Sequence, residues 1–241
     1  MMKKITGMNR LVALVVALLL AVPLARVTSA GEDKPTGLVT DKQTSVVYKP
    51  PLRGAPQSRV GGGTRGTGSK ASVLQVLAPD HAGLTTQAQP TIYWYARTPV
   101  AARFEFALID DEGIDPLLEL EEDSDRVAGF RYLNLGDYGI TLQPGVSYQW
   151  SVALVSDDTS RSSDLVSSGI IKRIEPGEAL RSRIENAAGI DLVSLYASEG
   201  LWYDALDSIT KLIEQTSADQ DLIVIRDSLL AQVGLPAVTG R

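Results

Sequence analysis

The sequence predicts a mainly β fold with added α-helix: an immunoglobulin- or fibronectin-like β-sandwich followed by a C-terminal helical subdomain. Short runs of alternating apolar and polar residues, separated by turn signals, fill residues 71–175. This pattern is typical of an all-β sandwich. Residues 176–241 change to the three- and four-residue apolar spacing of helices. The chain has no Cys, so its apolar core, and not disulfide bonds, has to hold the fold.

Residues 1–30 have the features of a secretory signal peptide. Three basic residues occur in the first ten, the apolar run Leu11–Ala25 follows, and small residues precede Gly31. The apolar run has 15 residues, which is short against the roughly 20 that a spanning helix needs. An uncleaved N-terminal anchor is the alternative. We expect export to the periplasm or the cell exterior, with no transmembrane span after cleavage.

Residues 31–70 are predicted to be a disordered, basic linker. Four prolines and a run with five glycines between 61 and 68 leave little apolar surface to offset the entropy of ordering. In this region, Ser45–Tyr48 is a candidate for a transient edge strand. Six basic and no acidic residues lie between Lys42 and Pro79, whereas residues 80–241 carry a net charge of −14. The basic arm either lies on its own acidic body or contacts an anionic partner.

Seven strands are expected in the sandwich region, and they alternate with turn residues. In two of them the large apolar side chains fall on one face, which indicates a sheet covered on one side. Trp94 is expected in the core. The seven segments are 73–77, 91–95, 103–108, 117–120, 130–135, 148–154 and 168–174.

Four helices are expected in the C-terminal subdomain. The first ends at Gly189, Asp191 caps the second, and Ser217–Gln220 has the capping-box pattern that begins the fourth. The third, from Trp202 to Ile213, has the strongest apolar stripe. The spacing partly matches a tetratricopeptide hairpin, but a solenoid core needs about three such repeats. We therefore expect these helices to pack on the sandwich or on a partner.

Two resemblances follow from local motifs. Leu142–Trp150 resembles the Leu-x-Pro-Gly-x-x-Tyr run of fibronectin type III domains, which implies that Tyr148 forms a tyrosine corner. A wider resemblance is carried by seven segments: Arg59–Gly66, Ala78–Pro79, Gly83–Thr86, Pro90–Tyr95, Leu142–Trp150, Leu195–Tyr196 and Gly200–Ala205. In these segments the chain resembles the exported domain-of-unknown-function family 928, which is common in cyanobacteria. That family has no established activity, so the resemblance implies an exported setting and a single sandwich-plus-helices unit, and it transfers no catalytic residue.

Several chemistries are disfavoured by composition and context. With no Cys and one His, the chain lacks thiol catalysis, Cys-based zinc sites and a multi-His metal site. Gly61–Gly66 matches a dinucleotide-binding pattern but lacks the strand before it and the helix after it. His81 is expected in an exposed turn, and no nucleophile-elbow motif accompanies it. We therefore expect no cofactor and no enzymatic activity.

The acid-rich segment Asp110–Asp125 has two interpretations. Calcium prefers oxygen-rich loops of this kind, so a calcium site between sandwich strands is one interpretation. The other is a solvated connection that keeps an edge strand soluble. Leu108 occupies the position of the first Asp ligand of an EF-hand loop, so that motif is excluded.

The function expected from the sequence is that of an exported, non-enzymatic binding or scaffold protein. It would engage a protein partner through its sandwich and helical surface. One alternative is envelope-glycan binding by the basic arm and exposed tyrosines, and another is a carboxylate hydrolase, which is disfavoured because no carboxylate pair has a defined spacing. Nucleic acid is not an expected partner of an exported acidic protein. The candidate partner-binding residues are Trp202, Tyr203, Tyr93, Tyr95, Arg59 and Arg65.

Overall fold

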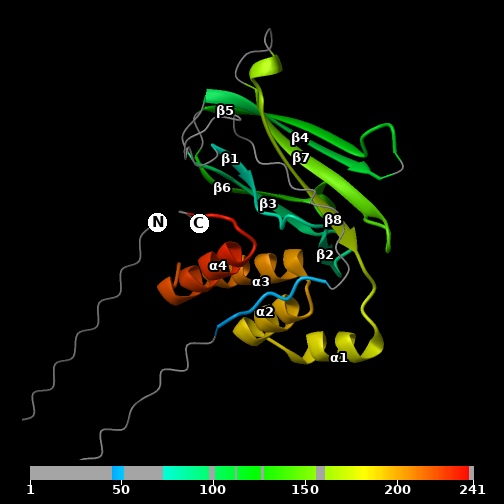
Figure 1. Cartoon of the computed structure of the whole chain (residues 1–241), viewed down its shortest axis with the longest axis vertical. Coiled ribbons are helices and arrows are strands. Elements are labelled where there is room, and N and C mark those ends of the chain that lie inside the picture. The colour runs from blue at the N-terminus through cyan, green and yellow to red at the C-terminus, as the bar shows by residue number, and fades with distance from the viewer. Residues whose placement is uncertain are drawn as a thin grey trace, which may run out of the picture. The chain divides into compact units, whose positions relative to one another are not determined.

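In the described part of the chain, eight strands form two sheets that face each other, and four α-helices follow them in the sequence (Figure 1). The computed structural model describes residues 45–51, 73–97, 101–111, 113–125, 128–155 and 161–238. All of these belong to one compact unit, residues 43–241. The predicted class, β-sheet followed by α-helix, is confirmed.

The larger sheet has the strand order β2-β8-β7-β4-β5, and the smaller sheet has the order β1-β3-β6. Neighbouring strands are antiparallel except for β2 and β8, which are parallel. The strands are β1 (Leu74–Val76), β2 (Gly83–Thr85), β3 (Thr91–Ala96), β4 (Ala101–Asp110), β5 (Leu118–Asp125), β6 (Gly129–Asn134), β7 (Ser147–Val155) and β8 (Leu165–Arg173).

The core between the sheets is built from alternating positions, as the sequence pattern predicts. Phe104, Phe106 and Leu108 on β4 are all buried, since every second side chain of a strand faces the same side. The ring of Phe106 lies 6.3 Å from that of Trp94 and 6.2 Å from that of Trp150. The expected tyrosine corner is also present.

That corner joins the two ends of the Leu142–Trp150 motif. The hydroxyl of Tyr148 accepts a hydrogen bond from the backbone N–H of Gln143 at 2.9 Å. Its ring is buried, so the corner fixes where the chain enters β7.

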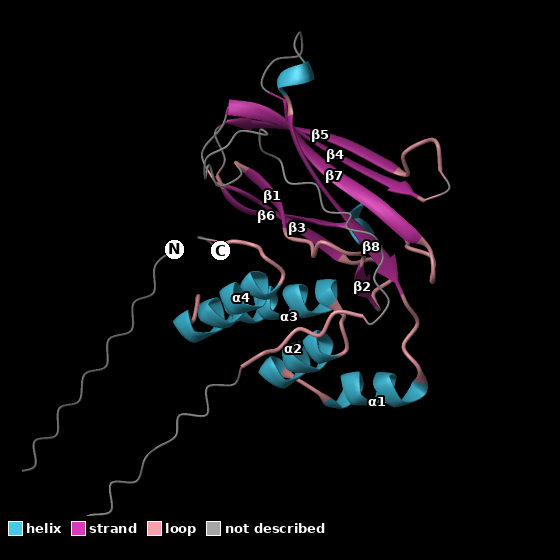
Figure 2. Cartoon of the chain, in the orientation of Figure 1, coloured by secondary structure: helices cyan, strands magenta, loops and turns pink. Residues whose placement is uncertain are grey.

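The helices form a third layer beneath the smaller sheet (Figure 2). Helix α3 carries the apolar stripe, and its Trp202, Leu206 and Ile209 are fully buried. Buried residues of the strands and of α2, α3 and α4 belong to one continuous hydrophobic core. The helices are α1 (Glu178–Asn186), α2 (Gly189–Ser198), α3 (Trp202–Gln215) and α4 (Gln220–Gln232).

Three local details differ from the sequence prediction. Strand β2 was not expected, because its three residues follow turn signals and its parallel partner β8 lies far along the chain. Helix α2 begins at Gly189, so Asp191 lies in its first turn and does not cap it. The cap of α4 is Asp219, whose side chain accepts from the N–H of Asp221. Ser217 has a left-handed backbone with φ of 56°.

Residues Ser45–Pro51, which we call the strap, correct the linker prediction for part of its length. Val46 and Tyr48 are buried, with 3% and 6% of their surface exposed. The strap runs beside α2, at the blue end of the colour scale in Figure 1. It forms no strand. The remainder of the predicted linker lies outside the described residues, as do the predicted signal peptide and most of the basic arm. Within the described ranges, no helix combines the length and apolarity needed to cross a bilayer.

Candidate functional site

The first turn of α3 attaches the helical layer to the sandwich. The indole N–H of Trp202 donates to the carbonyl of Leu77 at 2.9 Å. The hydroxyl of Tyr203 accepts from the indole N–H of Trp150 at 2.8 Å and donates to the carbonyl of Ile170 at 3.0 Å. Burial raises the pKa of Tyr203, so this hydroxyl keeps its proton and both hydrogen bonds. These contacts bridge the helices to both sheets.

The ring of Tyr203 fits because position 83 is a glycine. A Cβ atom on Gly83 would lie 2.6 Å from Cε2 of Tyr203, which is closer than van der Waals contact allows. The resemblance-carrying segments Gly83–Thr86 and Gly200–Ala205 therefore meet in space. Their role in the structure is to join α3 to the start of β2.

Asp204 extends the same attachment. Its carboxylate accepts from the hydroxyl of Thr85 at 2.7 Å and from the N–H and hydroxyl of Thr86 at 2.7 and 3.0 Å. Burial of the carboxylate raises its pKa to about 6, against the lowering effect of these hydrogen bonds. One turn along, Asp207 accepts from Tyr93 and Lys211. Each of the four carboxylate oxygens already has a donor from the protein, so this pair is structural.

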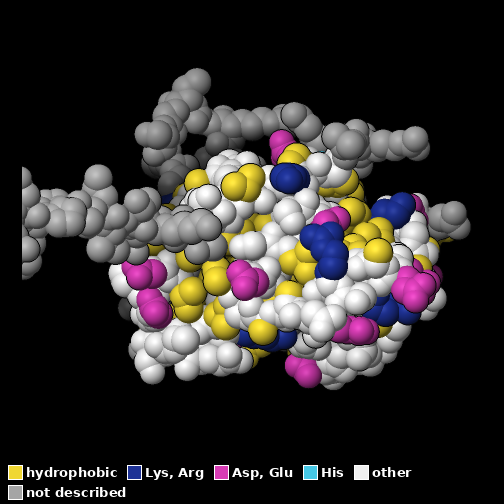
Figure 3. All heavy atoms as spheres, turned by 90° about the horizontal axis from the view of Figure 1, so that it is seen from below, with side chains coloured by type: hydrophobic (Ala, Val, Ile, Leu, Met, Phe, Trp, Pro, Cys, Tyr) yellow, Lys and Arg dark blue, Asp and Glu magenta, His cyan; other side chains and the backbone are white. Residues whose placement is uncertain are grey.

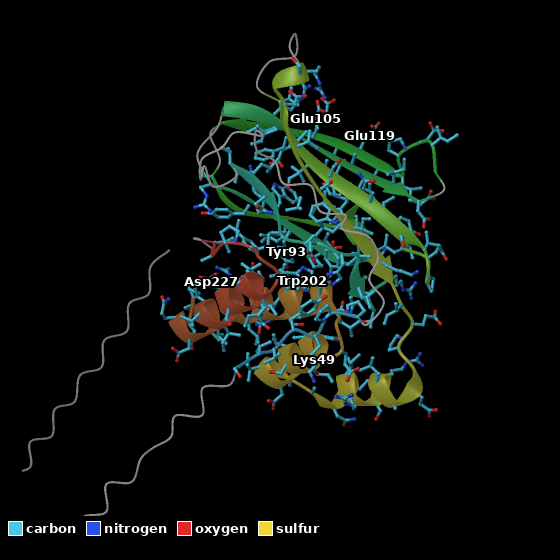
Figure 4. The ribbon with its side chains drawn as sticks, in the orientation of Figure 1. Lys49, Tyr93, Glu105, Glu119, Trp202 and Asp227 are labelled. Atoms are coloured by element: carbon cyan, nitrogen blue, oxygen red, sulfur yellow. The ribbon has the colours of Figure 1, made fainter. Side chains whose placement is uncertain are left out.

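Four of the six predicted partner-binding residues are buried, which corrects their assignment. Trp202 and Tyr203 have at most 1% of their surface exposed, and Tyr93 and Tyr95 at most 5%. The physical reason is that the helices cover the outer face of the smaller sheet. Figure 4 shows Tyr93 and Trp202 between that sheet and the helices. The other two residues, Arg59 and Arg65, lie outside the described part of the chain.

The hydroxyl of Tyr93 donates to Asp207 at 2.8 Å. Burial and the neighbouring carboxylate raise the pKa of Tyr93. All six residues of β3 are buried, because Trp94 faces the sandwich core while the two tyrosines face the helices. Glycan stacking on Tyr93 and Tyr95 is therefore excluded by their burial.

An open cleft lies where the edge strands β5 and β6 of the two sheets face each other, and we call it the edge cleft. Its cavity has a volume of about 250 Å³. Ligand pockets for drug-sized molecules are roughly 300–1,000 Å³, so this cleft suits one ring or a short chain. Apolar side chains from both sheets line its walls: Trp94, Phe104, Phe106, Leu120, Leu133 and Val152.

The rim of the edge cleft combines an exposed aromatic ring with polar groups. Tyr138 exposes 47% of its surface. Tyr132 also borders the cleft, but it pairs with Tyr93, and its ring lies 6.1 Å from that of Tyr93 on the helix-facing side of the sheet. Glu121, Glu122, Asn134 and Asp137 complete the lining. The carboxylate of Glu122 lies 3.5 Å from the guanidinium of Arg131, which itself lies over the ring of Phe104 at 5.2 Å. The rim therefore offers a flat apolar face beside hydrogen-bond acceptors.

Trp94, which lines the edge cleft, differs from the other two tryptophans in its hydrogen bonding. Its indole N–H is buried and has no acceptor among the described residues. A buried donor without a partner costs about 1–3 kcal/mol, and native proteins seldom retain one without a reason. The side chains of Trp150 and Trp202, in contrast, donate within the protein.

The position of the edge cleft was not predicted from the sequence. Tyr132 and Tyr138 were not among the candidates, although Glu121 and Glu122 belong to the acid-rich segment. Tyr138 ends the short 3-10 helix Leu135–Tyr138, where no apolar period marks it in the sequence. Its place at the cleft depends on which strands form the sheet edges, which the sequence pattern alone does not specify.

His81 is engaged on both sides of its ring. Its Nε2 lies 2.9 Å from the hydroxyl of Tyr48, and its Nδ1 lies 3.2 Å from a carboxylate oxygen of Asp80. The side chain is 17% exposed, so the expectation of an exposed turn is wrong for the ring. With both nitrogens engaged, neither is free to act as a general base without breaking a contact.

The acid-rich segment forms the end of β4, its turn and the edge strand β5. Its described carboxylates are spread over the end of β4, the turn and β5, and two of them pair with arginine at 3.5 Å, Glu121 with Arg103 and Glu122 with Arg131. Among the described residues, no group of three or more Asp, Glu or His side chains is arranged to hold a metal ion. Glu105 and Glu119, labelled in Figure 4, lie on the larger sheet, away from the helices.

Comparison with known families gives one clear result. The model of the Domain of Unknown Function family DUF928 matches residues 60–240. The chain belongs to the DUF928 family.

Other comparisons add little. No curated protein matches. Among solved structures, the apo structure of Bacteroides uniformis β-glucuronidase 3 is similar to 61% of this chain and to 26% of its own length, with 11% identity and a TM-score of 0.26. The match thus spans about a quarter of that enzyme, and a TM-score this low carries no argument about the function of this DUF928 chain.

Proposed function

We propose that this DUF928 protein is an exported, non-enzymatic binding protein that holds a sugar ring of an envelope glycan in the edge cleft. The observation that carries the proposal is the exposed ring of Tyr138 beside Glu122 and Asp137 at the rim of the cleft. Sugar rings present apolar C–H faces to aromatic rings and hydroxyl groups to carboxylates. Trp94 lines the same cleft, so its indole signal reports on a ring bound there.

The helical layer supports a partner-docking role less well. Charged side chains of both signs are scattered among hydrophobic ones on the helical face (Figure 3). Of the large hydrophobic residues in the described helices, only Val224 is exposed. The apolar stripe of α3 is buried within the chain, so it leaves no face for a partner helix.

A non-enzymatic role agrees with the chemistry of the described side chains. Buried Asp204 and partly exposed Asp207 accept hydrogen bonds from the protein at every carboxylate oxygen. In the edge cleft, Glu121 and Glu122 each pair with an arginine at 3.5 Å, whereas glycoside hydrolysis needs two free carboxyl groups on either side of the scissile bond. The signal sequence supports export, which would place the protein beside envelope glycans.

Co-sedimentation with purified envelope polysaccharide tests the proposal. The Tyr138→Ala variant should bind about 2- to 13-fold more weakly, since an aromatic contact contributes about 0.5–1.5 kcal/mol. The matched control is Val224→Ala, which removes an exposed apolar side chain elsewhere. Equal binding by both variants and the wild type would contradict the proposal.

A further inference from the structure

The strap lies in a groove of the helical layer, held mainly through its backbone. The N–H of Tyr48 donates to the side-chain oxygen of Gln232 at 2.8 Å, and the amide of Gln232 donates back to the carbonyl of Val46 at 2.9 Å. The N–H of Lys49 donates to the carbonyl of Ala197 at 3.0 Å. These hydrogen bonds are made to the main chain of an extended segment, so they do not depend on the identity of its side chains.

Alternate side chains of the strap enter the groove. Val46 and Tyr48 are buried, whereas Val47 between them is 52% exposed. The ring of Tyr48 packs edge-on against Trp202 at 5.1 Å, and its hydroxyl lies 2.9 Å from Nε2 of His81. Main-chain hydrogen bonds combined with pockets for alternate side chains are how proteins recognise extended peptides.

The groove is shaped for a close backbone approach. A Cβ atom on Gly200 would lie 2.8 Å from the carbonyl oxygen of Lys49. Beside the strap there is additional space of about 360 Å³, bordered by His81, Asp80 and Gln232. The groove is therefore larger than its present occupant.

The residues of the groove lie within the region matched by the family model, and the strap does not. The DUF928 match covers residues 60–240, which includes His81, Gly200, Trp202 and Gln232. The groove residues thus lie within the matched region of the chain, and the strap lies before it.

We propose that this groove is a peptide-binding site of the domain. It takes an extended partner segment with the pattern Val-x-Tyr-Lys, and in this chain the strap occupies it in cis. The basic residue of the pattern suits a body that carries a net charge of −14 between residues 80 and 241. This site is separate from the edge cleft and does not depend on glycan binding.

The test uses a fluorescent peptide with the sequence of Ser45–Pro51 and the full chain carrying Tyr48→Ala, which weakens the occupant. The peptide should bind this variant at least tenfold more tightly than the wild type, where the tethered strap competes at an effective concentration of about millimolar. A peptide with Ala in place of its Tyr should not bind. Val46→Ala is a second, milder way to free the groove if Tyr48→Ala unfolds the chain.

Two glycine variants, each added to the Tyr48→Ala chain, test whether the peptide binds in the groove. Adding Gly200→Ala should abolish peptide binding, whereas adding Gly189→Ala should preserve it. Both glycines have positive φ, 75° and 57°, but a Cβ on Gly189 meets nothing within 4 Å. Failure of the peptide to bind folded Tyr48→Ala or Val46→Ala chains would overturn the proposal, as would equal loss with both glycine variants.

Discussion

Replacing Tyr203 with Phe removes one oxygen atom from the bridge between α3 and the sandwich and leaves the packing volume almost unchanged. The fully buried indole N–H of Trp150 then loses its acceptor, and the carbonyl of Ile170 loses a donor. An orphaned buried donor costs about 1–3 kcal/mol. Tyr203→Phe should therefore lower the free energy of unfolding in urea by about 1–3 kcal/mol. For a chain of this size, 1 kcal/mol shifts Tm by about 2–4 °C, so Tm should fall by about 2–12 °C.

The assay is equilibrium unfolding in urea, followed by tryptophan fluorescence and by far-ultraviolet circular dichroism. Both signals should move together, since strands and helices share one core. Tyr132→Phe is the matched control, because its hydroxyl is on an exposed side chain, and it should change stability by less than about 0.5 kcal/mol. If Tyr203→Phe behaves like this control, the bridge does not attach the helices as argued.

Three further predictions concern charge and metal. The pKa of Asp204 is raised to about 6 in the folded state, against an ordinary value of 3.8. The folded state therefore binds this proton more tightly, so the free energy of unfolding should fall by about 3 kcal/mol as pH rises from 4 through 6. Urea unfolding at several pH values should show that Asp204→Asn removes this pH-dependent loss of stability. Hydrogen bonds from Arg161 and Arg103 lower the pKa of Glu105 to about 2, so its contribution should be present above about pH 4.5 and lost toward pH 2. Because this ion pair is at the surface, Glu105→Gln should cost no more than about 1 kcal/mol at pH 7, and unchanged acid unfolding in that variant would count against the pair. Calcium should leave Tm unchanged by scanning calorimetry, and stabilisation that chelator reverses would revive the calcium interpretation of Asp110–Asp125.

Much of the fold could be predicted because its signals are local. The alternation of Phe104, Phe106 and Leu108 identifies a strand by itself, and the apolar spacing after Trp202 identifies a helix. Strand β2 carries no such signal, since three residues following a turn do not establish a period. It exists because β8, far along the chain, offers it a parallel edge.

The candidate sites could not be predicted because burial is decided by distant residues. Tyr93 and Trp202 look like contact residues in the sequence, and the same apolar surface can bury against a partner or against the chain's own sheet. The strap illustrates the opposite case. Its composition predicts disorder, but Gln232, 184 positions after Tyr48, supplies the hydrogen bonds that order it. The edge cleft likewise depends on which strands end at the sheet edges.

The indole N–H signals of the three tryptophans in a ¹H–¹⁵N spectrum test the proposed glycan site most directly. Trp150 and Trp202 donate within the protein at 2.8 and 2.9 Å, whereas Trp94 at the edge cleft has no acceptor among the described residues. Soluble envelope oligosaccharide should shift the Trp94 signal, assigned with Trp94→Phe, and leave the other two in place. Saturating glycan that moves none of the three, or moves all of them equally, would contradict binding at the edge cleft.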